Sequence, residues 1–169
     1  MAAGETGPGQ VEILFLRHAD AGDPLAWRGP DEDRPLSAKG ERQAERVARH
    51  LEAIGAAPDA IITSPLLRAF QTAEAVARRF DREVVISDRL AGGLDVESLD
   101  ELLEEAGMPT RPLLVGHDPE FSETVSALIG AVGIAVRKGA LVRIDATLPL
   151  VEGGGDLRWL IPPDALKER

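Results

Sequence analysis

The sequence predicts an α/β fold: a three-layer sandwich with a mostly parallel central sheet of about six strands, helices on both faces and no large cap insertion. Short apolar runs alternate with amphipathic helical patterns along the chain, which is typical of a parallel sheet joined by helices. The run 112–115 is fully apolar, as a central parallel strand should be. The chain has 169 residues, 44% of them hydrophobic, which suits one domain with one sizeable core.

Local patterns place the elements in chain order. Ser37 is a plausible N-cap for a helix that runs to about Ile54 with apolar residues at helical spacing. Ser64-Pro65 and Asp118-Pro119 each suggest an N-cap followed by proline at the first helical position. Late strands flank Gly153–Gly155 and indicate a hairpin that closes one side of the sheet. Strands are expected at about 11–16, 60–63, 84–87, 112–115, 139–146 and 157–161, and helices at about 38–54, 66–80, 96–106 and from 119 onward.

Composition excludes several classes of protein. Lys and Arg number 19 against 29 Asp and Glu, so the formal net charge is −10, which disfavours binding to nucleic acid or to an anionic membrane surface. The chain has no cysteine, which excludes disulfides, thiolate metal sites and cysteine nucleophiles. Residues 1–10 are rich in glycine and lack the apolar stretch of a secretory signal, so a disordered leader is expected there. We therefore expect a soluble, cytoplasmic protein whose residues 11–169 form a single domain.

Cationic side chains follow three of the predicted strands. Arg17 and His18 come directly after the first strand, Arg68 lies in the first turn of the helix after the second, and His117 follows the fourth. In open α/β sheets, ligand sites gather beyond the carboxyl ends of the strands. Arginine gives bidentate contacts to phosphate oxygens, so these four residues predict a compact site for a phosphoryl group.

Other polar residues have simpler interpretations. His50 lies in mid-helix without a partner pattern and is expected to be structural. Ser64 lacks the G-x-S-x-G context of a hydrolase nucleophile and suits a helix cap better. The acidic run Asp31–Asp33 lacks the regular spacing of a calcium loop, so we expect a solvated loop there. The sequence offers no convincing metal or cofactor site.

Four segments, in order, resemble the motifs of the histidine phosphatase superfamily. Residues 14–19 (LFLRHA) resemble its R-H-G signature, and residues 34–44 (RPLSAKGERQA) resemble its P-L-T-x-x-G-x-x-Q-A segment. Residues 64–73 (SPLLRAFQTA) are similar to S-P-x-x-R-A-x-Q-T-A, and residues 115–119 (VGHDP) to the G-H-x-P form of its second histidine. The small size indicates the SixA-type phosphohistidine phosphatase branch.

The resemblance implies a role for each matched residue. His18 would be the nucleophile that becomes phosphohistidine, and Arg17, Arg68 and His117 would bind the phosphoryl oxygens. The chain departs from the family at Ala19, where glycine is usual, and in lacking the glutamate that larger members use as general acid. Asp20, two residues after His18, is the first candidate to replace that glutamate as proton donor.

Asp95 is a second and weaker candidate for the proton donor. The implied domain is histidine-phosphatase-like, and its implied activity is a metal-independent, cofactor-independent phosphatase. Its substrate would be phosphohistidine on a protein, such as a phosphotransfer domain or carrier. Two alternatives stay open: a phosphomonoesterase acting on a small phosphorylated metabolite, and a non-catalytic module that binds phosphoproteins.

Overall fold

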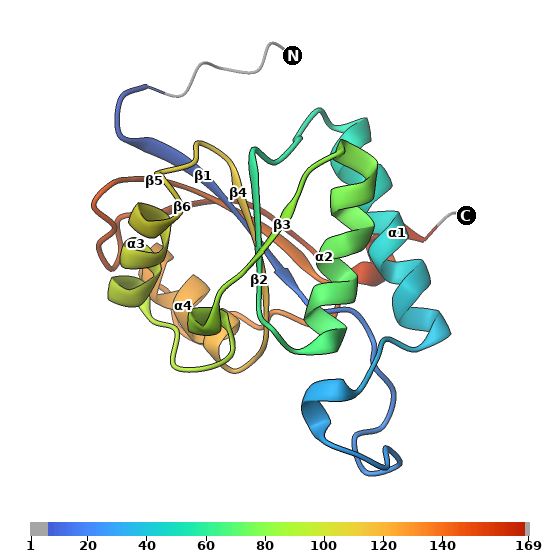
Figure 1. The fold of residues 1–169 in the computed structure, drawn as a ribbon. Coiled ribbons are helices and arrows are strands. Elements are labelled where there is room, and N and C mark those ends of the chain that lie inside the picture. The colour runs from blue at the N-terminus through green and yellow to red at the C-terminus, as the bar shows by residue number, and fades with distance from the viewer. Residues whose placement is uncertain (1–6, 168–169) are drawn as a thin grey trace.

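The structure, a computed structural model, describes residues 7–167. Its six strands form one sheet in the order β3-β2-β4-β1-β5-β6 (Figure 1). The strands are β1 (Gln10–Arg17), β2 (Ala60–Thr63), β3 (Val84–Ile86), β4 (Pro112–Gly116), β5 (Leu141–Thr147) and β6 (Asp156–Ile161). The α-helices of the described part are α1 (Ala38–Ala53), α2 (Leu67–Phe80), α3 (Val96–Glu105) and α4 (Glu120–Ile129).

The predicted fold class is confirmed, because helices cover both faces of this sheet. In Figure 1, α1 and α2 lie on one side of the strands, and α3 and α4 lie on the other. Buried residues on the two faces of β1 divide accordingly: Leu14 and Leu16 pack with α1 and α2, and Ile13 and Phe15 pack with α3 and α4. Within residues 7–167, no helix is long and apolar enough to cross a membrane.

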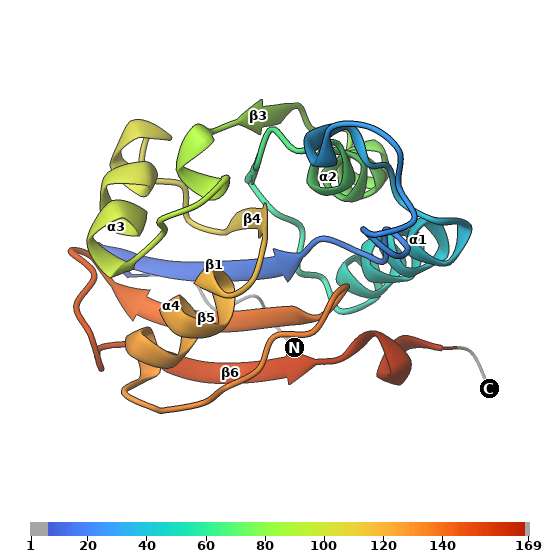
Figure 2. The ribbon, with the colours of Figure 1, turned by 90° about the horizontal axis from the view of Figure 1, so that it is seen from below.

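Strand pairing brings the ends of three parallel strands to one edge of the sheet. β1 pairs with β4 in parallel, so Arg17 lies beside Gly116, and β2 pairs with β4 so that Thr63 lies beside Val115. The residues that follow these strands are therefore neighbours in space. β5 runs antiparallel to β1 and to β6, and the predicted late hairpin lies at one side of the sheet (Figure 2).

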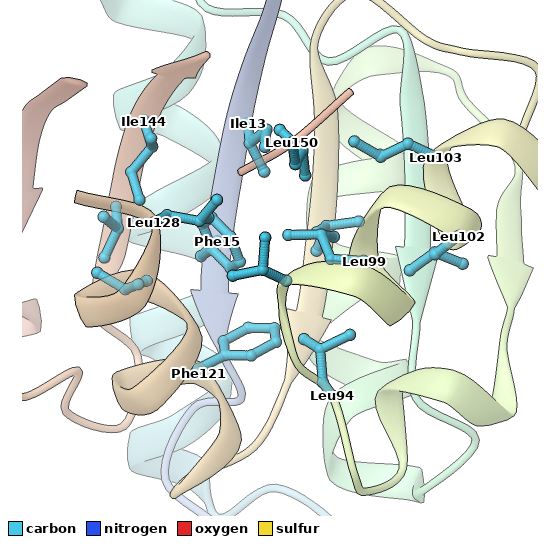
Figure 3. Packing of buried hydrophobic residues seen from close by; sticks show 14 of the residues in the cluster. Ile13, Phe15, Leu94, Leu99, Leu102, Leu103, Phe121, Leu128, Ile144 and Leu150 are labelled. Carbon is cyan, nitrogen blue, oxygen red and sulfur yellow. The ribbon is translucent and has the colours of Figure 1, made fainter. Parts of the chain in front are cut away.

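The core on the α3 and α4 face supports the strand end that carries His117. Figure 3 shows Phe15 of β1 facing Phe121 of α4, and the two rings meet edge to face with centroids 5.4 Å apart. A Cβ atom added at Gly116 would lie 2.7 Å from the Phe121 ring, so a larger residue would push the helix away. Glycine at this position therefore lets α4 pack directly behind His117.

Two predicted helix caps are wrong. The helix after β2 begins at Leu67 with Leu66 at the N-cap position, so Ser64 is not its cap. The last helix begins at Glu120 with Pro119 at the N-cap position. The Asp118 carboxylate instead accepts hydrogen bonds from the backbone N–H and the hydroxyl of Ser122, at 3.0 and 2.6 Å. Both side chains lie outside the N-cap position but still accept a backbone N–H at the start of the helix, Asp118 from Ser122 and Ser64 from Leu66 at 3.2 Å.

The predicted leader falls partly outside the described residues, which exclude 1–6. Residues 7–10 form a turn that enters the sheet: the backbone N–H of Gln10 donates to the Gly7 carbonyl at 3.0 Å. The Gln10 side chain accepts from the Gly7 N–H at 2.9 Å, and β1 begins at Gln10.

Candidate active site

The four residues predicted from the strand ends line one cavity of about 350 Å³. Arg17 and His18 reach it from the end of β1, Arg68 from the first turn of α2, and His117 from the residue after β4. The imidazole rings of His18 and His117 lie with their centroids 5.1 Å apart. The lining as a whole comprises Arg17, His18, Pro24, Arg34, Leu66, Arg68, Ala91, His117, Asp118, Glu120 and Lys138.

Backbone contacts from neighbouring elements fix the turn that carries His18. The His18 N–H donates to the Gly116 carbonyl at 2.9 Å, and the Ala19 N–H donates to the Thr72 hydroxyl at 3.1 Å. A Cβ atom at Gly40 would lie 1.9 Å from the Asp20 carbonyl oxygen, so α1 approaches this turn as closely as only glycine allows. The nucleophile candidate thus sits on a turn held by both α1 and α2.

Alanine at position 19 fits this turn. Among the described residues, positive φ angles outside glycine occur at Asp81 and Met108, so Ala19 has an ordinary backbone conformation. Its methyl group is fully buried against Leu36, Ala44 and Ala75, outside the cavity lining. The departure from the usual glycine therefore leaves the cavity unobstructed.

The environment of His18 defines which of its nitrogens is free. Nδ1 lies 2.8 Å from the carbonyl oxygen of Ala19, and a carbonyl only accepts, so Nδ1 carries the proton. The pKa of His18 is lowered to about 3: burial is the main cause, the charges of His117, Arg68 and Arg17 act in the same direction, and the hydrogen bond to Ala19 opposes them. The ring is therefore neutral at pH 7 with the Nε2 lone pair available, which is the form needed for nucleophilic attack.

His117 is also neutral. Burial, followed by the charges of Arg68 and Arg17, lowers its pKa to about 4. Its Nε2 lies 2.7 Å from the Ser64 hydroxyl, which explains why Ser64 follows β2 without capping α2. The strand register places Ser64 and His117 side by side, so the hydroxyl fixes the orientation of the ring.

Two guanidinium groups leave hydrogen-bond donors unpaired at the cavity. Arg17 donates from Nη1 to the Val136 carbonyl at 3.0 Å and to Asp118 at 3.4 Å, and Arg68 donates to Asp31. The buried Nε atoms of Arg17 and Arg68 have no hydrogen-bond partner within residues 7–167. An unpaired buried donor is costly, and the oxygens of a phosphoryl group are suitable acceptors. The arrangement is therefore that of an oxyanion site.

The two candidate proton donors lie elsewhere. The Asp20 carboxylate accepts from the Ser37 hydroxyl at 2.6 Å and is outside the cavity lining. This hydrogen bond is the main cause that lowers the pKa of Asp20, which keeps the group ionised. Asp95 caps α3 in a reciprocal box with Ser98. The geometry gives neither carboxyl group access to a leaving group in the cavity.

Sequence reasoning missed several lining residues. Arg34 and Lys138 add positive charge to the cavity, and Asp118 and Glu120 add carboxylates next to His117. Arg34 begins the segment 34–44 that resembles a family motif, and this position could have indicated that Arg34 belongs to the site. Asp31, expected in a solvated loop, instead binds Arg34 and Arg68, and nothing in the sequence pairs residues so far apart.

The comparisons with known proteins identify the family of the chain. Residues 13–106 match the family model of the histidine phosphatase superfamily, branch 1. The chain belongs to this superfamily. An uncharacterized protein of Picosynechococcus is 31% identical to it over 166 residues, which cover 90% of this chain and all of that protein.

Solved structures of SixA proteins are similar over almost the whole chain. The protein histidine phosphatase SixA complexed with tungstate matches with a TM-score of 0.80 and 22% identity, covering 93% of this chain and all of that chain. A candidate phosphohistidine phosphatase SixA from Agrobacterium tumefaciens matches with a TM-score of 0.72 and 26% identity, covering 90% of this chain and 99% of that chain. The expected SixA-type branch is thus confirmed.

No group of three or more His, Asp or Glu residues within residues 7–167 is arranged to hold a metal ion. Arginine and lysine side chains in the cavity lining carry positive charge of the kind that stabilises a phosphoryl group. Independence from metals and cofactors stays a prediction.

The lowered pKa of His18 predicts a pH-dependent stability. Between the usual value of 6.5 and about 3, the unfolded chain binds a proton at this histidine and the folded chain does not, so acid favours unfolding. When the pH is lowered from 7 to 5, the free energy of unfolding should fall by about 2 kcal/mol more in wild type than in His18→Ala. Urea unfolding of both proteins at pH 7, 6 and 5 measures this difference. Equal slopes would show that His18 titrates normally in the folded protein.

Proposed function

We propose that this chain is a phosphatase that works through a phosphohistidine on His18 and that it dephosphorylates phosphohistidine on proteins. Membership of the histidine phosphatase superfamily supports a phosphatase. The single observation that carries the proposal is the state of His18: a buried, neutral ring whose Nδ1 is bound to a carbonyl, which leaves Nε2 unprotonated, in a cavity that Arg17 and Arg68 also line.

The chemistry takes two transfers. The Nε2 lone pair attacks phosphorus, the bond from phosphorus to the substrate nitrogen breaks, and that nitrogen leaves with its electron pair and takes up a proton. Water then attacks the phosphoryl group on His18, the new N–P bond breaks, and inorganic phosphate is released with neutral His18 restored. Arg17, Arg68 and His117 bind the phosphoryl oxygens in both steps and stabilise the charge that spreads over them.

The lack of a helical lid between Arg68 and His117 favours a protein substrate. Forty-eight residues separate Arg68 from His117, and α2, β3, α3 and β4 use most of them. The apolar side of α3 is buried in the core through Leu99 and Leu103 (Figure 3), and no residue of α3 is in the cavity lining. A loop or helix that bears a phosphorylated side chain can therefore reach His18.

The chemistry of the leaving group favours phosphohistidine over alkyl phosphates. An alkyl phosphate expels an alkoxide, which needs a positioned acid. Neither Asp20 nor Asp95 is placed to be one, and Asp118 is engaged by Arg17 and Ser122, which leaves Glu120 as the other carboxylate in the cavity lining. A phosphohistidine expels imidazole, whose conjugate acid has a pKa of about 6.5, so its protonation near neutral pH needs little help.

This difference predicts an order of substrates. We expect kcat/KM at constant pH to be highest for phosphoramidates and phosphohistidine proteins, lower for aryl phosphates, and lowest for sugar or glycerol phosphates. The measurement is the initial rate across these three classes with one enzyme preparation. Preference for a small sugar phosphate over every phosphohistidine donor would instead establish the phosphomonoesterase alternative. Binding without turnover of any donor would establish the non-catalytic module.

A further inference from the structure

The segment between β1 and α1 inserts one carboxylate between two arginines of the site. Asp31 lies in a short 3₁₀ turn of this segment, which extends from the end of the sheet where β1 ends (Figure 1). One Asp31 oxygen accepts from Arg34 Nε at 3.0 Å, and the other accepts from Arg68 Nη2 at 3.0 Å. The Asp31 carbonyl also accepts from Arg68 Nη1 at 2.9 Å. The same carbonyl accepts from the Arg34 backbone N–H at 3.1 Å, so a single residue contacts Arg68 twice and Arg34 twice.

These contacts select which edge of the Arg68 guanidinium remains free. Asp31 occupies Nη1 and one hydrogen of Nη2, which form the end of the planar fork. The Nε hydrogen and the second Nη2 hydrogen point along the adjacent edge, and Nε has no partner within residues 7–167. Two parallel donors on one edge are the geometry that binds a phosphoryl group bidentately.

The carboxylate also offsets a repulsion. The side chains of Arg34 and Arg68 are each only 9% exposed, and both line the cavity. Two guanidinium charges held this close with little water around them repel each other, and each would turn toward solvent without a shared anion. Arg34 is further held by the Ala21 carbonyl at 2.8 Å, so it provides a fixed point for Asp31.

We propose that Asp31 is a positioning residue of this phosphatase: its bridge to Arg34 and Arg68 presents the free edge of Arg68 to the transferring phosphoryl group. The inference rests on the proposed function of the site and adds to it a residue outside the four matched motif positions. Asp31 touches neither the substrate nor the reacting atoms, so its effect must pass through Arg68.

The test is a double-mutant cycle with a matched control. The variants are Asp31→Ala, Asp31→Asn, Arg68→Ala and the double Asp31→Ala/Arg68→Ala. Asp33→Ala is the control, because Asp33 lies in the same turn, carries the same charge and is exposed. Each protein is measured for kcat/KM on a phosphoramidate, for orthovanadate affinity by calorimetry and for its thermal unfolding temperature.

We expect Asp31→Ala to lower both kcat/KM and vanadate affinity by about 10²-fold, the scale that a misplaced binding group costs. Asp31→Asn should fall between wild type and alanine, because an amide oxygen can serve only one of the two arginines. In the Arg68→Ala background, removing Asp31 should change kcat/KM and vanadate affinity by less than about twofold. The reason is that Asp31 acts through Arg68, and the effects of two residues that act through one contact do not add. Asp33→Ala should match wild type.

Two results would overturn the positioning role. One is that Asp31→Ala or Asp31→Asn binds vanadate as tightly as the control Asp33→Ala does. The other is an equal loss on removing Asp31 with and without Arg68, which would show that Asp31 acts on its own. Vanadate binding needs no turnover, so the role of Asp31 is decided even if wild type hydrolyses no donor, in which case the proposed function fails by itself. Should the alanine variant not fold, the asparagine variant and its own double mutant carry the same comparison.

Discussion

Replacing His18 with alanine is expected to abolish turnover and the covalent phosphoenzyme while leaving the fold intact. The proposed nucleophile is Nε2 of this ring, which lines the cavity with Arg17 and Arg68, and alanine has no atom to replace it. The fold should survive because the turn is held by its backbone, through the His18 N–H to Gly116 and the Ala19 N–H to Thr72. The measurement is to trap acid-labile phosphate on the enzyme with a phosphoramidate and to map the labelled residue.

His50→Ala is the matched control for this experiment. His50 lies on α1, lines neither the cavity nor its approach, and should label and turn over like wild type. A phosphate label on His117, or substantial turnover by His18→Ala, would contradict the mechanism. Circular dichroism of both variants separates a chemical loss from unfolding.

The order of elements could be predicted from the sequence because the length and spacing of each apolar run identify it as either a strand or one face of a helix. Strand 60–63 and the helix ending near Ile54 were placed within a residue of their observed bounds. The two proline-based caps were misplaced, because the observed N-cap positions are Leu66 and Pro119. Ser64 has a tertiary partner in His117 besides Leu66 N–H, whereas Asp118 binds Ser122 in the first turn of its own helix. Local pattern does not reveal a tertiary partner such as His117.

The four central site residues could be found because they follow strands directly, and parallel strand ends meet at one edge of a sheet. Asp20 shows the limit of that reasoning. It is two residues from His18 in sequence, yet its carboxylate turns to Ser37 of the next helix. Asp31 shows the opposite case, since it lies 37 residues from Arg68 in an acidic, exposed run that is typical of a solvated loop. Only the folded path of the segment before α1 brings them together.

Arg68→Ala is expected to reduce kcat/KM by about 10³-fold or more with little change in thermal stability. Removing one preorganised donor from a buried oxyanion site costs about 10² to 10³-fold, and Arg68 supplies both a charge and the unpaired Nε edge. Stability should hold because Asp31 keeps its ion pair with Arg34 when Arg68 is lost. Packing of α2 depends on Ala69, Ala73 and Val76, which the substitution leaves in place.

Arg78→Ala tests whether this loss is specific to the site. Arg78 is on the same helix, forms an exposed ion pair with Glu45 and is remote from the cavity lining, so its removal should leave kcat/KM unchanged. Vanadate inhibition should weaken in Arg68→Ala in parallel with kcat/KM, because both report binding of the transferring phosphoryl group. An Arg68→Ala protein that unfolds but keeps wild-type activity per folded molecule would show that Arg68 is structural, and Asp31 would then have no catalytic group to position.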